Sequence, residues 1–403
     1  MIAVFKPSVA RGVIAAPPSK SMAHRLLICA GLSRGESMVR NVTLSADIAA
    51  TADCLRALGA SIEISGNDAL IRGVNSEPPI PAADLLCRES GSTLRFLIPV
   101  CLLSDRKLTL RGSEALFRRP LDVYEDICRK QGLTFDRTAA SLTVQGPLSG
   151  GDFVVSADVS SQFISGLLFA LPLLDRDSRI RLLPSAESRP YIDLTIQALH
   201  IFGICVSRDG DTFFIPGGQV YRPALTQVEG DCTAAAYYQA LNLVGGDVSV
   251  TGLAPDTLQG DRSYATFFEQ LKQGAPVIDI ADCPDLGPVL MAAAAACHGA
   301  TLTGTRRLRF KESDRDRAMQ EELLKFGACV EIEVNSVHVL PGSLHAPERL
   351  LDGHNDHRIV MALSVLASRF GGSISGAEAV RKSLPDFFER LSKLGLDVTA
   401  DGI

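Results

Sequence analysis

One pattern recurs six times along the chain: a short helix-like stretch ends at a glycine and runs into an alternating, strand-like segment. A supersecondary unit of this size cannot bury its apolar face alone, so the copies are expected to stack on one another. Equivalent loops of stacked units lie on equivalent faces, so motifs that are far apart in the sequence can lie together at one site. The pivotal glycines follow one another at spacings of 73, 71, 71, 53 and 68 residues: Gly59, Gly132, Gly203, Gly274, Gly327 and Gly395.

Each repeat is interpreted as strand, helix, strand, helix and then a pair of strands. In the first copy, residues 61–64 alternate in polarity, residues 65–68 have turn composition, and residues 69–72 return as a second strand. The fifth copy repeats this hairpin over residues 328–340. Alternating strands and helices predict an α/β protein with mixed sheets. Three repeats per domain would make two similar halves, with crossings near residues 17–18 and 227–230.

Composition sets the broad class. The 403 residues are 46% hydrophobic and 21% charged, which is typical of folded proteins and predicts two or three domains. The net charge of −6 does not favour nucleic acid as a partner. Neither a membrane span nor a signal peptide is recognisable. The ten cysteines form no C-x-x-C pair, and we interpret them, Cys29, Cys54, Cys128 and Cys329 among them, as reduced core residues of a cytoplasmic protein.

Seven predicted helices begin with polar, capping-type residues, and basic residues lie close to several of these starts. The starts are Ser19–Ser21, Ser90–Thr93, Ser160–Gln162, Gly230–Thr233, Pro284–Asp285, Ser313–Asp314 and Asn355–Asp356. Each start taken alone is also explained as an ordinary cap, and Ser313 with Asp316 resembles a capping box. A cation at a helix N-terminus opposes the helix dipole, however, and a bound anion would relieve this. The cations Lys20, Arg25, Arg95, Lys311, Arg315, His357 and Arg358 therefore predict a small substrate with several anionic groups.

Two carboxylates stand among these cations, Asp285 and Glu312. They are candidates for proton transfer, and a carboxylate among cations is held ionised, which suits a base more readily than an acid. The alternatives are that Asp285 is a helix cap and that Glu312 only pairs with Arg315. Dinucleotide, P-loop and zincin fingerprints are missing from the sequence, and the histidines show no spacing typical of a metal site.

Nine strings in order make the chain similar to the 5-enolpyruvylshikimate-3-phosphate (EPSP) synthase family over essentially its whole length. They are PPSKSMAHR, SGSTLR, SSQFISGLL, SRPYIDLT, EGDCTAAAYY, PDLGPVL, KESDR, NDHR and KSLPDFFERL. The resemblance implies a two-domain inside-out α/β barrel, the enolpyruvyl transferase fold, with six βαβαββ repeats, three per domain. It also implies a discontinuous domain of residues 1–17 and 229–403, a second domain of residues 18–228, and an active site in the cleft between them.

The same resemblance implies the reaction: the 5-hydroxyl of shikimate 3-phosphate adds to phosphoenolpyruvate, and phosphate leaves from a tetrahedral intermediate. No metal or organic cofactor is implied, and we expect a cytoplasmic monomer with small-molecule substrates. The implied proton-transfer residues are Asp285 and Glu312, in either role, assisted by Lys20. Contacts to shikimate 3-phosphate are implied for Lys20, Ser21, Arg25, Ser160, Ser161, Gln162, Ser188, Tyr191, Asp285 and Lys311. Contacts to phosphoenolpyruvate are implied for Lys20, Gly91, Arg119, Gln162, Arg315, Arg358 and Lys382.

Two positions depart from the family pattern. Glu89 and Arg307 stand where asparagine is frequent, and both bear on the phosphoenolpyruvate contacts and on sensitivity to glyphosate. We expect Glu89 to be ion-paired, with Arg88 or Arg307 as the partner. The competing interpretations are a sister enzyme that acts on a UDP-sugar, a catalytically silent anion-binding protein, and an RNA-terminal phosphate cyclase. The basic stretch of residues 111–121 lacks the reactive cysteine typical of the UDP-sugar enzymes.

Overall fold

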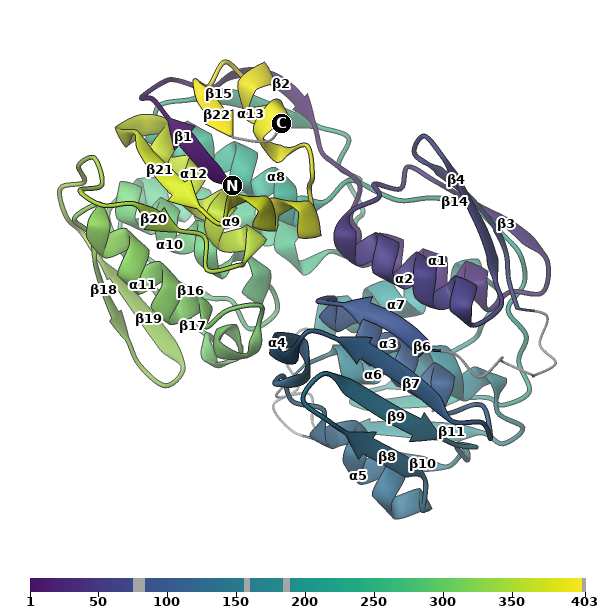
Figure 1. The fold of residues 1–403 in the computed structure, drawn as a ribbon. Coiled ribbons are helices and arrows are strands. Elements are labelled where there is room, and N and C mark those ends of the chain that lie inside the picture. The colour runs from purple at the N-terminus through teal and green to yellow at the C-terminus, as the bar shows by residue number, and fades with distance from the viewer. Residues whose placement is uncertain (75–83, 156–159, 184–188, 401–403) are drawn as a thin grey trace. The chain divides into compact units, whose positions relative to one another are not determined.

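The computed structural model describes residues 1–74, 84–155, 160–183 and 189–400, and the chain divides into two compact units (Figure 1). One unit consists of Pro18–Glu229. The other joins Met1–Pro17 to Gly230–Ile403.

The unit of Pro18–Glu229 contains three four-stranded sheets, in the orders β14-β3-β5-β4, β6-β7-β9-β8 and β10-β11-β13-β12. In each sheet the first two strands are parallel, and an antiparallel hairpin follows. The strands are β3 (Glu36–Arg40), β4 (Ser61–Ser65), β5 (Asp68–Arg72), β6 (Asp84–Arg88), β7 (Leu108–Gly112), β8 (Thr134–Arg137), β9 (Ser141–Gln145), β10 (Asp152–Val155), β11 (Ser178–Leu182), β12 (Ser207–Asp209), β13 (Thr212–Ile215) and β14 (Leu225–Gln227). The helices are α1 (Lys20–Gly31), α2 (Ala46–Ala57), α3 (Gly91–Cys101), α4 (Glu114–Phe117), α5 (Asp122–Gln131), α6 (Gln162–Ala170), η1 (Leu171–Leu173) and α7 (Arg189–Ile201).

The second unit repeats this plan with the sheet orders β16-β17-β19-β18 and β20-β21-β1-β22, and with a two-stranded sheet β15-β2. Its strands are β1 (Ile2–Phe5), β2 (Arg11–Ala15), β15 (Asp247–Thr251), β16 (Val277–Asp279), β17 (Ala300–Thr303), β18 (Cys329–Ile332), β19 (Ser336–Leu340), β20 (Leu351–Asp352), β21 (Gly372–Ser375) and β22 (Val398–Ala400). Its helices are α8 (Cys232–Ala240), η2 (Leu241–Val244), η3 (Gly260–Ser263), α9 (Tyr264–Gln273), η4 (Pro284–Leu286), α10 (Gly287–Ala296), η5 (Arg306–Phe310), α11 (Arg315–Lys325), α12 (His357–Phe370), η6 (Ala377–Lys382) and α13 (Phe387–Lys393).

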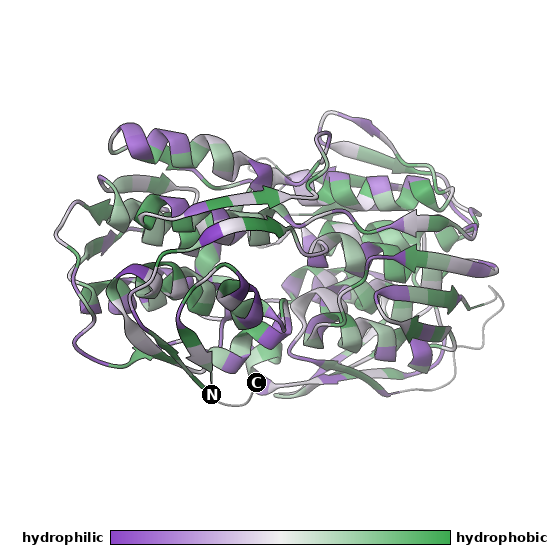
Figure 2. Ribbon diagram, turned by 90° about the horizontal axis from the view of Figure 1, so that it is seen from above, coloured by the Kyte–Doolittle hydropathy of each residue, from purple (hydrophilic) through white to green (hydrophobic). Residues whose placement is uncertain are grey.

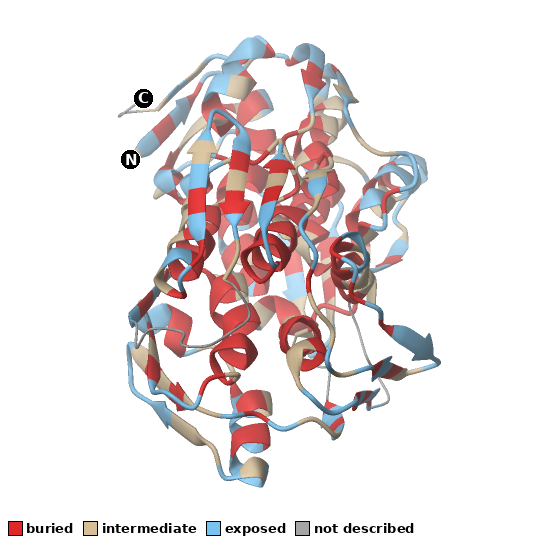
Figure 3. Ribbon diagram, turned by 90° about the vertical axis from the view of Figure 1, so that its right-hand side faces the viewer, coloured by how far each residue is buried: buried red, intermediate tan, exposed pale blue. Residues whose placement is uncertain are grey.

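The first helix of each repeat is buried along nearly its whole length, so helices form the centre of each unit. Almost every residue of α1, α3 and α6 is buried in one unit, and the same holds for α10 and α12 in the other. Buried residues follow these helices, whereas the strands alternate between buried and exposed positions (Figure 3). The strands alternate in hydropathy in the same way (Figure 2). Helices inside and sheets outside are what the resemblance implied, and the predicted fold class is confirmed.

The pivotal glycines terminate helices as predicted. Five of the six have a positive φ: Gly59, Gly132, Gly203, Gly327 and Gly395. A left-handed residue after the last turn lets its N–H satisfy a free helix carbonyl, and glycine has no Cβ to oppose that conformation. Gly274 differs, because its φ of 168° is ordinary extended backbone.

The fourth repeat is shorter than the expected βαβαββ unit. Its sheet has two strands, β2 and β15, among the described residues, and the segment after Gly274 becomes β16 of the next sheet. In this described stretch, the hairpin that follows the second helix in the other copies is therefore missing. This explains why the spacing from Gly274 to Gly327 is 53 residues, whereas the other spacings are 68–73.

Side-chain caps begin most of the predicted helices. Ser19, Ser90, Asp231 and Asp356 each accept a hydrogen bond from a backbone N–H in the first turn of α1, α3, α8 and α12. The prediction of a capping box at Ser313 is wrong, since Asp314 caps α11 and the Ser313 hydroxyl donates to Asp356. Asp285 is not a cap either: it lies in η4, and α10 begins after Leu286 without a side-chain cap.

The cysteines are free thiols, and seven of the ten are buried: Cys29, Cys54, Cys87, Cys101, Cys128, Cys232 and Cys283. The prediction that Cys329 belongs to the core is wrong. It lies on β18, at the edge of its sheet, and is exposed, as is Cys205. Within the described ranges, the helices are all too short or too polar to span a membrane.

Candidate active site

The first motif lies at the start of α1, where Ser19 caps the helix and Lys20 is its first residue. The Lys20 ammonium is 2.9 Å from a carboxylate oxygen of Asp47 on α2, and both side chains are largely buried. Arg25, one turn further on, donates to the carbonyls of Ser21 and Tyr191 and to the Thr195 hydroxyl, at 2.6, 2.8 and 2.9 Å. The Arg25 bonds hold Ser21, Arg25 and Tyr191 of the predicted set together, and Lys20 directly precedes Ser21 in α1.

The second and third motifs meet at the N-termini of α3 and α6. The Gln162 amide donates to the Ser92 hydroxyl and accepts from Arg95, both at 2.9 Å. Arg119 approaches Gly91 so closely that a Cβ at this glycine would lie 2.7 Å from the Arg119 guanidinium. The helix N-terminus, the amide and the guanidinium together offer hydrogen-bond donors to an anion.

The remaining predicted residues of this unit lie at the start of α6 or outside the described residues. The Ser160 hydroxyl accepts from the backbone N–H of Gln162 at 3.2 Å, and Ser161 is buried directly before the helix. Ser188 lies outside the described residues, so its predicted role stays a prediction.

A buried chain of hydrogen bonds underlies these helix starts, and sequence patterns gave no sign of it. His24 bonds to Thr51 at 2.8 Å, Thr51 to Thr93 at 2.7 Å, and Thr93 to the capping Ser90 hydroxyl at 2.7 Å. Burial, and then the charges of Lys20 and Arg25, hold the pKa of His24 well below its usual range. A neutral His24 therefore ties α1 to the caps of neighbouring helices.

In the other unit, Asp285 is the meeting point of three cations. Its carboxylate is 2.8 Å from Arg358, 2.9 Å from Arg315 and 3.1 Å from Lys311. Burial favours the neutral acid, but the charges of Arg358, Lys311 and Arg315 outweigh it and hold the pKa of Asp285 well below its usual range. The cations therefore favour the ionised form of Asp285.

Glu312 lies beside this cluster and pairs with Arg315 at 2.6 Å, as the simpler interpretation of the sequence proposed. Arg315 contacts Asp285, Glu312 and Asp356 at once, and its side chain is 1% exposed. Burial opposes the charge of this guanidinium, but the three carboxylates raise its pKa further above its usual value. Burial likewise lowers the pKa of Lys311, against the opposing charge of Asp285.

Asp356 is a structural centre that the sequence identified only as a helix start. Its fully buried carboxylate accepts from Arg315 Nε at 2.8 Å, from Ser313 at 3.1 Å and from the backbone N–H of Arg358 at 2.9 Å. It thus joins the starts of α11 and α12. The signals in the sequence were its capping-type side chain at a helix start and its place in the NDHR string.

Lys382, at the end of η6, donates to the backbone carbonyl and the side-chain oxygen of Asn355, at 2.6 and 2.9 Å. This brings Lys382 to the residue that precedes Asp356. The second unit therefore gathers Asp285, Lys311, Glu312, Arg315, Arg358 and Lys382.

The two atypical positions have different surroundings. Arg307 is buried, and its guanidinium contacts the backbone carbonyl of Ala281, in the segment that leads to Asp285. Arg88, one of the two partners expected for Glu89, forms an ion pair with Asp53 at 2.7 Å. Glu89 itself is partly buried, and the idea that it is ion-paired stays a prediction.

Comparisons with known proteins agree on one family. The family model described as EPSP synthase (3-phosphoshikimate 1-carboxyvinyltransferase) matches residues 4–391. A 3-phosphoshikimate 1-carboxyvinyltransferase of Clostridium kluyveri is 40% identical, covering 98% of this chain and 97% of the relative. A 3-phosphoshikimate 1-carboxyvinyltransferase of Clostridium perfringens is 36% identical, covering 97% of this chain and 98% of the relative. The fold matches an EPSP synthase structure from Acinetobacter baumannii with a TM-score of 0.81, at 22% identity and with 99% of each chain covered.

Proposed function

Because the chain belongs to the EPSP synthase family, we infer that it transfers the carboxyvinyl group of phosphoenolpyruvate to the 5-hydroxyl of shikimate 3-phosphate. Phosphate is the second product. The observation that carries this proposal most directly is the Asp285 carboxylate, held ionised among Arg358, Lys311 and Arg315. Such a group of cations around one carboxylate suits a reaction whose two substrates are polyanions.

The proposed chemistry is an addition followed by an elimination. The 5-hydroxyl oxygen forms a bond to carbon 2 of phosphoenolpyruvate and gives up its proton, while the methylene carbon gains one. The resulting tetrahedral carbon carries the phosphate, the carboxylate, the methyl group and the new ether. The C–O bond to phosphate then breaks, and the methyl group loses a proton to restore the double bond.

Asp285 and Glu312 are the proposed proton-transfer pair, and we assign Asp285 as the base for the 5-hydroxyl. In the free protein three cations make it a weak base. Anionic substrate groups that share Lys311, Arg315 and Arg358 reduce the positive field and so raise the basicity of Asp285 on binding. Glu312, which shares Arg315 with Asp285, is assigned as the proton donor to the methylene carbon. This role requires Glu312 to be protonated, and an anionic substrate group that takes over Arg315 favours its protonated form.

The other residues are proposed to bind the charged groups of the substrates. Shikimate 3-phosphate is assigned to Lys20, Ser21, Arg25, Ser160, Ser161, Gln162, Ser188, Tyr191, Asp285 and Lys311. Phosphoenolpyruvate is assigned to Lys20, Gly91, Arg119, Gln162, Arg315, Arg358 and Lys382, with Lys20 assisting the leaving phosphate. In one unit, the close approach of Arg119 to Gly91 and the hydrogen bond from Gln162 to Ser92 support the assignment. In the other unit, the hydrogen bonds of Asp356 to Arg315 and Arg358 support it. The proposal requires the assigned residues of both units to act on one bound pair of substrates.

The proposal includes no metal or organic cofactor, because lysine and arginine side chains supply the positive charge that the phosphates and carboxylates need. It also includes a cytoplasmic, monomeric enzyme made of the two domains predicted above. Seven buried free thiols suit a reducing compartment, and a single chain carries every assigned residue.

The test is phosphate release from phosphoenolpyruvate by the purified protein, with and without shikimate 3-phosphate. We expect release only with both, and formation of the enol ether in equal amount. Release with a UDP-sugar in place of shikimate 3-phosphate would instead support the sister enzyme. Silence with every acceptor, together with tight binding of shikimate 3-phosphate, would support a catalytically inactive anion-binding protein.

Glu89 is proposed to be ion-paired and compatible with catalysis. A Glu89→Asn variant, which restores the residue frequent in the family, is expected to change kcat/KM only slightly. An increase of orders of magnitude would contradict this and would show that the natural residue impairs phosphoenolpyruvate binding.

A further inference from the structure

The loop that leads from β20 into α12 contains two consecutive non-glycine residues in the left-handed region. His354 has a φ of 49° and Asn355 a φ of 50°. A Cβ makes this conformation unfavourable, although histidine and asparagine tolerate it better than most residues. The loop of residues 352–356 therefore keeps this shape only because surrounding contacts hold it.

Glu322 reaches this loop from α11, and its buried carboxylate takes part in four hydrogen bonds. Lys325 donates to both oxygens at 2.8 Å, and the backbone N–H of Asp352 donates to one of them at 2.9 Å. His354 Nε2 lies 3.0 Å from the other oxygen. The Glu322 side chain is 1% exposed, so these bonds are shielded from water. We call Glu322, Lys325 and His354 the clamp.

The clamp holds the N-terminal end of the strained segment. The Asp352 side chain accepts from the backbone N–H of His354 at 2.7 Å, which closes the turn from inside. Lys325 also donates to the carbonyl of Leu350 at 3.0 Å, just before β20. Both the backbone and the side chain of His354 are thereby held.

The residues directly after His354 hold the proposed phosphoenolpyruvate residues. Asn355 accepts from Lys382 through its backbone and side-chain oxygens. Asp356 accepts from Arg315 and from the backbone N–H of Arg358. A change in the backbone at His354 therefore moves the anchors of three cations.

Helix α11 contacts the loop at two points. Arg315 is its first residue and Glu322 lies seven residues later, so both project from one face, about two turns apart. Arg315 binds Asp356 and Glu322 binds the segment before it. The helix and the loop are thus tied together as one rigid piece.

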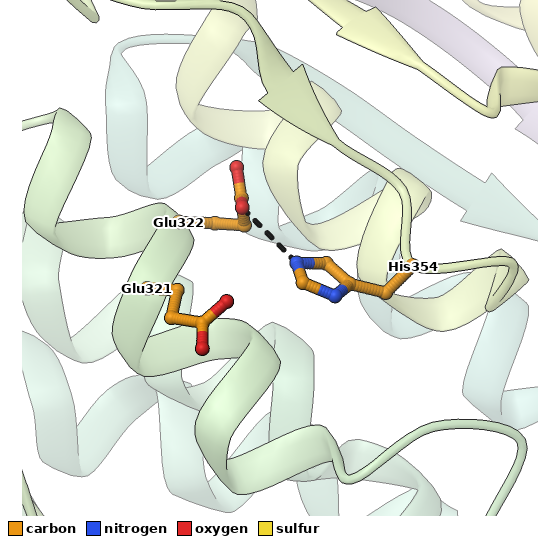
Figure 4. Close-up of side chains that lie close together, drawn as sticks. All are labelled: Glu321, Glu322 and His354. Carbon is orange, nitrogen blue, oxygen red and sulfur yellow. Dashed lines mark hydrogen bonds and ion pairs between the residues drawn. The ribbon is translucent and has the colours of Figure 1, made fainter.

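A divalent cation is the alternative explanation for this cluster. Glu321, Glu322 and His354 bring possible ligand atoms within 4.8 Å of one another (Figure 4). Lys325, however, already contacts both oxygens of Glu322, and His354 Nε2 faces the same carboxylate. Because the Lys325 ammonium already binds both carboxylate oxygens of Glu322, the cluster is better explained as a hydrogen-bonded clamp than as a metal site.

We propose that Glu322 and His354 are positioning residues that hold Lys382, Arg315 and Arg358 in the geometry that phosphoenolpyruvate requires. The proposal rests on the function proposed above. The clamp touches none of the reacting groups in this assignment. It acts through the backbone of residues 354–356, so its loss affects the binding of phosphoenolpyruvate first.

The charges around His354 make the clamp sensitive to pH. Glu321 and Glu322 on α11 and Asp352 on β20 act on the imidazole, and Lys325 contacts the same Glu322 carboxylate. The hydrogen bond to Glu322 raises the pKa of His354 above its usual value, against the effect of burial. As the pH rises through this raised pKa, His354 loses its positive charge and its ion pair with Glu322 is lost.

The kinetic test compares Glu322→Gln and His354→Gly with Glu321→Gln as the matched control. The amide introduced by Glu322→Gln would place a donor against Lys325, and glycine in place of His354 removes the hydrogen bond without opposing the left-handed backbone. We expect both to raise KM for phosphoenolpyruvate roughly 10- to 100-fold, because a displaced cation loses a charge-assisted hydrogen bond to the substrate. KM for shikimate 3-phosphate should change far less. Glu321→Gln removes a neighbouring charge and should alter either KM by no more than about twofold.

A conservative variant separates positioning from folding. His354→Gln keeps an N–H donor and should recover part of the phosphoenolpyruvate affinity that His354→Gly loses. Equal loss for both substrates, or a fall in kcat that follows only the folded fraction, would overturn the positioning role.

A readout independent of turnover separates this proposal from the proposed function. The imidazole of His354 is titrated by NMR in the natural protein and in Glu322→Gln, and we expect a lower pKa in the variant. An unchanged pKa would refute the clamp even in an active enzyme. A lowered pKa in a protein that releases no phosphate would support the clamp and refute the function instead.

Discussion

Gly166 lies where α6 packs tightly against α3 and against Tyr124 of α5, and replacing it with alanine tests the packing that holds Gln162. A Cβ at Gly166 would lie 2.2 Å from the Tyr124 hydroxyl and 2.5 Å from the backbone carbonyl of Arg95. The carbonyl belongs to α3 and cannot move alone. The Tyr124 hydroxyl itself donates to that carbonyl at 2.7 Å, so the contact involves three elements at once.

The expected destabilisation combines opposing contributions. Overpacking a close-packed interior costs about 1–3 kcal/mol, and disturbing the buried Tyr124 hydrogen bond costs about 1 kcal/mol more. Alanine is the better helix former by about 1 kcal/mol. The net effect is a loss of about 2 kcal/mol, which corresponds to a fall in Tm of about 4–8 °C for a domain of this size.

The assay is calorimetry of Gly166→Ala beside Gly274→Ala. A Cβ added at Gly274 would have nothing within 4 Å of it, and the backbone there is extended, so alanine should leave Tm unchanged or raise it slightly. Because Gln162 begins α6 and contacts Ser92 and Arg95, Gly166→Ala should also raise KM for both substrates. A Gly166→Ala protein as stable as the natural one would refute the packing argument.

Three further outcomes follow from the second unit. Asp285→Asn should bind shikimate 3-phosphate, measured by calorimetric titration, yet lose at least about 100-fold in kcat, as expected for removal of a general base; near-natural kcat would remove Asp285 from the chemistry. Asp356→Ala should lower the unfolding free energy in denaturant by about 3–5 kcal/mol, because it leaves the buried Arg315 without one of its partners; a loss below about 1 kcal/mol would show that the other carboxylates compensate. The clamp's contribution, measured as the Tm difference between natural protein and Glu322→Gln, should be largest between about pH 4.5 and 6.5. The pKa of Glu322 is lowered in the folded protein, so the stability that its carboxylate contributes is lost as the pH falls below the usual pKa of glutamate. The pKa of His354 is raised, so the stability that its imidazolium contributes is lost as the pH rises through that raised pKa. A Tm difference that does not change with pH would exclude both titrations.

Local features of the fold were predictable because they depend on short stretches of sequence. Glycine after a helix-like run predicted the left-handed C-terminus at five of six positions, and alternation predicted the hairpins β4–β5 and β18–β19. The shortened fourth repeat was signalled by the short spacing after Gly274, yet only strand pairing revealed that β16 joins the next sheet. Choosing between Ser313 and Asp314 as the cap also needed the structure, since both are good capping residues.

The sequence by itself indicated where helices start and which of these starts carry cations, because capping and the helix dipole act within one turn. It thereby indicated anion binding, and its motifs indicated the family. Only the tertiary structure decided the pairings: Lys20 with Asp47, Asp285 with Arg358, and Glu322 with His354. These partners are 27 to 73 residues apart in the chain. Their meeting depends on how the buried helices pack, and no local pattern records that packing.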